Sequence, residues 1–180
     1  MLPKNTFKKL EDFLKKHKVP RLTKTQPKAT EKADAGVIHR RAKKAASKKI
    51  PIDASKPDYA QFKKKLMDAF KDFDNKKGKK HKMSEIYIKA YISKQVFYKM
   101  LERPPAKDTV ILIAFALEVT LQKAEELLKN VGYSLEYCDY RDLIFRFCFE
   151  NEITDILEIN EVLKQEKERP LLKDKRNKSI

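Results

Sequence analysis

Residues 106–117 (AKDTVILIAFAL) are almost continuously apolar, and this run constrains the fold more than any other feature of the chain. A helix that is apolar on all sides has to be surrounded by other elements. The next segment starts after Thr120, a favourable helix N-cap, and stops at Gly132, which can adopt the left-handed conformation that ends a helix. We therefore expect residues 106–117 to form the central helix of an all-helical bundle.

Five further segments have helical periodicity and begin with a residue that can cap a helix. The side chains of Ser, Thr and Asp accept hydrogen bonds from the unpaired N–H groups of a first helical turn. Together with the central helix and its successor, these segments predict a compact bundle of about six to seven short helices over residues 58–167. The predicted helices are 58–74 from Asp58, 84–91 from Ser84, 93–102 from Ser93, 139–150 from Asp139 and 154–165 from Thr154.

The two short helices 84–91 and 93–102 follow each other closely and form a helix-turn-helix motif. The second is stopped by Arg103-Pro104-Pro105, because proline has no backbone N–H to donate. The residues expected to pack inward from the first three helices are Tyr59, Phe62, Leu66, Phe70, Phe73, Ile86, Tyr87, Ile88, Val96, Phe97 and Met100.

The positive charge is concentrated before this bundle. The net charge is +16; residues 1–82 hold 26 basic and nine acidic side chains, whereas residues 83–164 hold ten and 14. Residues 19–57 combine this charge with few apolar side chains, a composition that predicts disorder. We therefore divide the chain into a basic arm (1–57), the helical domain (58–167) and a loose tail (168–180). Within the arm, Phe7, Leu10, Phe13 and Leu14 share one face of a short amphipathic helix predicted at 6–16.

The run HRRAKKAASKK in the arm is the strongest candidate contact for a polyanion, because closely spaced cations release counterions when they bind phosphates. Such a run also serves as a localisation signal or a solubilising tail, and both alternatives stay open. The candidate contact residues are Arg40, Arg41, Lys43, Lys44, Lys48 and Lys49.

The sequence argues against an enzyme. Asp139, Asp142 and Glu150 share a helical segment, but no His, Cys or Ser nearby completes a catalytic arrangement. Only three glycines occur, so there is no glycine-rich phosphate loop, and we expect no cofactor and no metal site. We assign no site to His17, His39 and His81, and we expect Tyr133, Tyr137 and Tyr140 to be packing residues.

Cys138 and Cys148 have neither a metal-ligand spacing nor the pattern of a disulfide framework, and we interpret both as buried thiols of a reducing compartment. No apolar run reaches the roughly 18 residues of a membrane span, and the N-terminus lacks the apolar centre of a signal peptide. We therefore expect a cytoplasmic protein without a membrane span.

The segment ISKQVFYKMLERPPAKDTVILIAFALEVTLQKAEELLKNVGYSL resembles the lambda-repressor-like family of helix-turn-helix domains. A narrower branch with a two-helix C-terminal extension is similar at Gly132-Tyr133, at Arg141-Asp142-Leu143-Ile144 and at Asn160-Glu161-Val162-Leu163. In this family the second helix of the motif enters the major groove of DNA. The resemblance implies that Ser93, Lys94, Gln95, Tyr98 and Lys99 form the DNA-contacting face.

The chain departs from the family pattern at Tyr87 and Tyr91, where the family has a small residue and often a glycine. Two helices joined by such bulky residues need a rearranged turn. Glu85 also lies where a phosphate would pass.

We expect a DNA-binding protein of the transcription-regulator type, in which the arm supplies nonspecific affinity. The alternatives are a protein-interaction module built on a helix-turn-helix scaffold and an RNA-binding protein that uses the arm. Relatives of this fold often bind DNA as dimers, so a homodimer is a further expectation.

Overall fold

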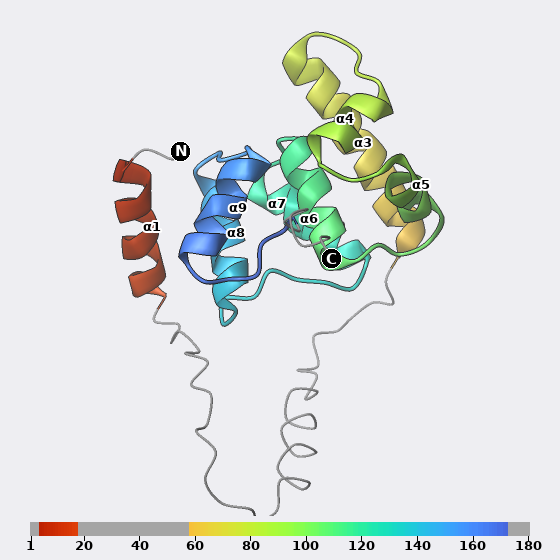
Figure 1. Cartoon of the computed structure of the whole chain (residues 1–180). Helices are drawn as coiled ribbons and strands as arrows, with labels where there is room; N and C mark the ends of the chain where they lie inside the picture. Colours follow the sequence, from red (N-terminus) through yellow and green to blue (C-terminus); the bar gives the residue numbers. More distant parts are fainter. Residues whose placement is uncertain (1–3, 18–57, 173–180) are drawn as a thin grey trace, which may run out of the picture. The chain divides into compact units, whose positions relative to one another are not determined.

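The computed structural model describes residues 4–17 and 58–172. These residues form eight α-helices and no strand, as predicted for an all-helical protein (Figure 1). The helices are α1 (Lys4–Lys16), α3 (Tyr59–Lys77), α4 (Met83–Lys89), α5 (Lys94–Glu102), α6 (Lys107–Ala116), α7 (Leu121–Asn130), α8 (Tyr140–Glu150) and α9 (Ile156–Gln165).

Helix α6 occupies the centre, as the apolar run predicted. All of its residues from Val110 to Ala116 are buried, and it packs against α4, α7 and α9. The ring of Phe115 stacks on Phe149 of α8 with centroids 4.0 Å apart and planes inclined by 9°. Figure 1 shows α3, α4 and α5 on one side of α6 and α8 and α9 on the other. The residues that pack against α6 therefore come from segments far apart in the chain.

Most of the predicted helix caps are present. The side chains of Asp58, Ser93, Thr120 and Asp139 each accept a hydrogen bond from the backbone N–H three residues further on. Gly132 follows α7 with φ of 81°, the left-handed conformation predicted for it. The starts of α3, α5, α7 and α8 are thus encoded locally.

Two caps were assigned to the wrong residue. Helix α4 begins at Met83, one residue before Ser84, and Lys82 occupies the cap position, where its N–H faces the Glu85 carboxylate at 3.5 Å. Helix α9 is capped by Asp155 instead of Thr154, because the Asp155 carboxylate accepts from both Leu157 N and Glu158 N at 2.8 and 3.4 Å. A carboxylate that reaches two N–H groups at the positive end of a helix stabilises it more than a single hydroxyl does.

Helix α3 also continues past the predicted end at residue 74. It runs to Lys77 and stops at Gly78, whose φ of 67° is left-handed. Residues 75–77 therefore extend the helix, and Lys76 and Lys77 form ion pairs with Glu118, which also pairs with Lys89 of α4.

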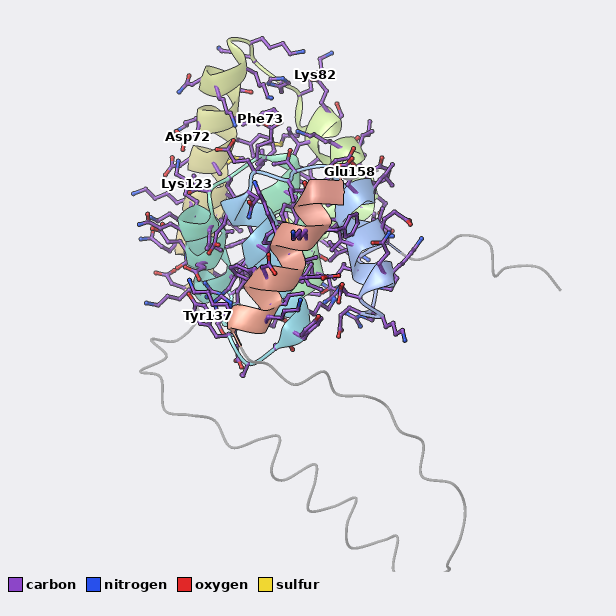
Figure 2. The ribbon with its side chains drawn as sticks, turned by 90° about the vertical axis from the view of Figure 1, so that its left-hand side faces the viewer. Asp72, Phe73, Lys82, Lys123, Tyr137 and Glu158 are labelled. Atoms are coloured by element: carbon purple, nitrogen blue, oxygen red, sulfur yellow. The ribbon has the colours of Figure 1, made fainter. Side chains whose placement is uncertain are left out.

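The amphipathic segment near the N-terminus forms α1, which packs against α8. Leu10 and Leu14 are buried, and the ring of Phe13 lies 5.5 Å from that of Phe147. Figure 2 looks onto α1 and shows Tyr137 near one end of this helix. The rings of His17 and Tyr137 stack there with centroids 5.8 Å apart. A helix this short is marginal alone, so burial of its apolar face against α8 stabilises it.

Three inward-facing or buried assignments are wrong. Val96 and Ile88 are exposed, because no described element packs on the α4–α5 surface where they lie. Cys138 is exposed, since it lies in the loop before α8; Cys148 is buried, and burial raises the pKa of its thiol to about 12.

No helix among residues 4–17 and 58–172 is long and apolar enough to span a membrane.

The chain remains packed just beyond α9. Leu171 is buried, and the N–H of Leu172 donates to the Asn160 side-chain oxygen at 3.0 Å. Asn160 is itself buried, so this bond satisfies a polar group inside the bundle.

Candidate nucleic-acid interface

The structure brings the five residues singled out on the second motif helix to one surface. Phe97 and Met100 turn to the core, which leaves the opposite side of α5 open. The Ser93 hydroxyl caps the helix by accepting from Val96 N at 3.2 Å, and four of the polar or aromatic side chains that follow it in α5 are exposed. The exposed residues of this surface are Ser93, Lys94, Gln95, Tyr98 and Lys99, and we call it the α5 face.

The turn between α4 and α5 accommodates both tyrosines. Tyr91 adopts a left-handed conformation with φ of 55°, and Ile92 N donates to Tyr87 O at 3.0 Å. Tyr87 lies half-buried with its ring 5.8 Å from Phe97, so it fills the angle between the two helices. Tyr91 takes the backbone conformation of a turn glycine at a cost of about 1 kcal/mol. Its ring is left exposed.

Helices α3 to α5 form a basic region. Residues 58–103 hold 13 Lys and Arg against six Asp and Glu, whereas residues 104–172 hold eight against 14. The helices are packed together: Phe70 of α3 contacts Phe97 of α5 edge-on at 6.2 Å, and the Tyr59 hydroxyl donates to Met100 O. The positive charge is thus carried by one side of the folded bundle as well as by the N-terminal arm.

Three of these cations are tied to one carboxylate. Glu118, directly after α6, accepts ion pairs from Lys89 at 2.8 Å, Lys77 at 3.0 Å and Lys76 at 3.3 Å. Burial would raise the pKa of Glu118, but hydrogen bonds from the lysines outweigh it and lower the pKa to about 2. Glu118 therefore joins the end of α3 and α4 to the central helix, and it removes these lysines from the set available to a ligand.

A second cross-link holds α3 on α7. Lys123 and Asp72 lie together at one edge in Figure 2, joined by an ion pair of 2.6 Å, and Lys65 pairs with Glu126 at 2.7 Å. The α3 lysines at this contact serve the fold.

The cations in α5 and at the residue directly after it are different. Neither Lys99 nor Arg103 has an ion-pair partner within residues 4–17 and 58–172. The Lys94 ammonium group lies 5.9 Å from the centre of the Tyr98 ring and makes no ion pair there. The α5 face thus presents positive charge that no carboxylate of the described fold neutralises.

Arg103 was missed as a site residue because the triplet with two prolines was interpreted only as a helix stop. It follows Lys99 by four residues and comes directly after α5, where its backbone N–H still donates to Lys99 O at 3.0 Å, so the two residues are neighbours at the end of the helix. That spacing is the signal that could have identified it.

The same surface exposes large apolar side chains. Of the eight exposed large hydrophobic residues among those described, five lie in α4, the turn and α5, and Ile88 is the most exposed at 66%. Exposed apolar side chains gathered on one part of a fold are a feature of surfaces that contact other molecules. The five are Met83, Ile88, Tyr91, Val96 and Tyr98.

The candidate arm residues Arg40, Arg41, Lys43, Lys44, Lys48 and Lys49 lie outside the described residues.

Tyr133 and Tyr137 are exposed, and the Arg146 guanidinium stacks over the Tyr137 ring at 4.0 Å, which ties that tyrosine to a packed position. His81 bonds Asp74 through Nδ1 at 2.8 Å and lowers the pKa of that carboxyl, so it braces the loop after α3.

No protein-family model matches this chain, and no curated protein or solved structure matches it. The interpretation of the α5 face therefore depends on its own geometry and chemistry.

Proposed function

We propose that the protein binds nucleic acid, with duplex DNA as the ligand, through the α5 face. The observation that carries the proposal is the set of unpaired cations and the amide of Gln95 on one exposed helix of the basic region. Gln can pair bidentately with adenine, and Lys can donate to guanine, so the residues at the start of α5 suit base edges in a major groove. The lambda-repressor-like resemblance supports the same orientation of α5, and it makes a transcription regulator the first biological role to test.

The test compares two double variants of the full chain that each lose one Lys and one Gln. Lys94→Ala/Gln95→Ala removes the base-reading candidates, and Gln122→Ala/Lys129→Ala removes the same groups from exposed positions of α7. Selection from a random duplex library should show a changed sequence preference for the α5 variant alone, by about 1–3 kcal/mol for each bidentate hydrogen-bond pair removed. Equal preferences for both variants and the parent chain would refute base reading by α5.

A second candidate function is a protein-interaction module, and the exposed apolar side chains of the α4–α5 surface favour it. Ile88→Ser removes the most exposed of them without touching the cations of α5. Two results together would replace DNA binding with the protein-interaction module as the function. Binding to duplex DNA would show no sequence preference, and Ile88→Ser would abolish capture of a purified protein partner.

A further inference from the structure

We propose that Lys99 and Arg103 form a clamp for a backbone phosphate of the bound nucleic acid, in a groove between α5 and α6. This inference rests on the proposed function. It gives a phosphate-binding role to Lys99, which the resemblance placed in the DNA-contacting face, and it adds Arg103 as a binding residue.

The groove is a hollow of about 260 Å³ where the chain passes from α5 to α6. Lys99 lines it from α5, Arg103 lines it from the position directly after α5, and Thr109 lines it from α6. Its remaining wall is apolar and includes Val96 and Pro104. A cationic rim over an apolar wall matches a phosphate attached to a sugar, because the phosphate takes the charge and the sugar ring packs on the wall.

The positive charge of the groove is not compensated by nearby carboxylates. Glu102 lies between the two cations in sequence, but it acts on Tyr59 of α3, whose pKa is raised first by burial and then by this carboxylate. Asp108 at the start of α6 is held by Arg141 at 2.8 Å and Arg169 at 2.5 Å. Neither carboxylate lines the groove, so both Lys99 and Arg103 are left available to an anionic ligand.

The position of the groove along α5 favours the backbone over the bases. A helix rises about 1.5 Å per residue, so Lys99 lies about 7.5 Å beyond Lys94 along the axis. Arg103 follows the last residue of α5 and therefore lies further still from the start of the helix. In helix-turn-helix docking the N-terminal residues of the second helix meet base edges. Groups further along the helix meet the flanking strand, where the forked guanidinium and the Thr109 hydroxyl suit phosphate oxygens.

The experiment measures the salt dependence of duplex binding by the full chain with Arg103→Ala, Arg103→Lys and a matched control, Lys129→Ala. Lys129 is an exposed lysine of α7 that lies outside the groove. Removal of one phosphate contact lowers the slope of log K against log salt by about 0.9 and weakens all sequences alike. Arg103→Ala should show this decrease, Arg103→Lys should restore the slope, and Lys129→Ala should match the parent chain. Lys99→Ala should behave as Arg103→Ala does and leave the sequence preference unchanged.

The outcomes separate the clamp from the proposed function. If Arg103→Ala has the same salt slope as Lys129→Ala while Lys94→Ala/Gln95→Ala changes sequence preference, the clamp is refuted and base reading by α5 stands. If Lys99→Ala changes the sequence preference, Lys99 is a base reader and the clamp is again refuted. If the parent chain binds no duplex at low salt, the proposed function and the clamp both fail. Thermal unfolding of each variant shows that the fold is retained.

Discussion

Residues 58–103 and 104–172 differ in charge, burial and surface. The first region, α3 to α5, has seven more basic than acidic residues and carries five of the eight exposed large hydrophobic side chains. The second, α6 to α9, has six more acidic than basic residues and contains two helices with long buried stretches, from Val110 to Ala116 and from Asp142 to Phe149. The comparison teaches that one region supplies most of the buried interior, whereas the other carries the excess of cations and most of the exposed large apolar side chains.

The largest expected effect comes from the interior of the α6–α9 region. Phe115→Ala removes a fully buried ring that stacks on Phe149, so it should lower the free energy of unfolding by about 3–5 kcal/mol. Denaturant unfolding followed by circular dichroism measures this. A decrease below about 1 kcal/mol would contradict the view that α6 is the centre of the core.

The next effect tests a charge buried in the same region. Asp142 is 3% exposed and accepts from Lys107 Nζ at 2.6 Å. Lys107→Met removes the ion pair and leaves the carboxylate only the backbone N–H of Glu136, at 2.9 Å, so it should cost about 3 kcal/mol at pH 7.

The pH dependence of this cost has a definite sign. Desolvation raises the pKa of Asp142, so the folded state takes up a proton more readily than the unfolded chain. The deficit of Lys107→Met should therefore shrink as the pH falls from 7 toward 4, and Lys107→Met/Asp142→Asn should be more stable than Lys107→Met at pH 7. A deficit independent of pH would show that poorer packing, not the buried charge, is responsible.

A smaller effect is expected at the contact that joins the two regions. Glu118→Gln removes the carboxylate that holds Lys76, Lys77 and Lys89, and it should cost about 2 kcal/mol at pH 7. The pKa of Glu118 is lowered from 4.5 to about 2, so its contribution is complete above pH 4.5 and disappears as the pH falls through 2.

Chemical denaturation of the parent chain and of Glu118→Gln at pH 7, 4 and 2.5 measures how the difference between their free energies of unfolding decreases as the pH falls. Glu126→Gln is the control, because Glu126 makes a single, more exposed ion pair with Lys65 and should cost less than about 1 kcal/mol. Equal costs for the two variants would mean that Glu118 is an ordinary surface carboxylate.

The smallest effect on stability is expected on the α5 face. Tyr98 is 44% exposed, so Tyr98→Ala should change the free energy of unfolding by no more than about 0.5 kcal/mol. Removal of its apolar contact with a ligand should weaken duplex binding about five-fold, which corresponds to roughly 1 kcal/mol. Parallel unfolding and binding titrations measure both. Destabilisation without weaker binding would place Tyr98 in the fold and not in the interface.

Helix starts show how far local patterns reach. Ser93, Thr120 and Asp139 were identified correctly, because a cap needs only its own side chain and the next two or three N–H groups. Thr154 and Asp155 are adjacent and both can cap, so the pattern alone did not distinguish them. Small shifts of this kind leave the fold unchanged.

Side-chain burial at Val96, Ile88 and Cys138 was not predictable from the pattern. Each is apolar or thiol-bearing and lies in or beside a helix, yet each is exposed. Whether a helical face is covered depends on where the following elements lie, and the α5–α6 connection borders Val96 without covering it, which leaves the groove open.

The sequence by itself determined the all-helical class, the central position of residues 106–117, most of the helix caps and the exposed residues of the α5 face. These features depend on periodicity and on hydrogen bonds within one turn of the chain. Only the tertiary structure decided the packing of α1 on α8, the pairing of Glu118 with lysines of two helices, and the groove that joins Arg103 to Thr109. These features bring together residues that are distant in the chain, so they depend on the angles at which whole helices pack, and no local pattern contains that information.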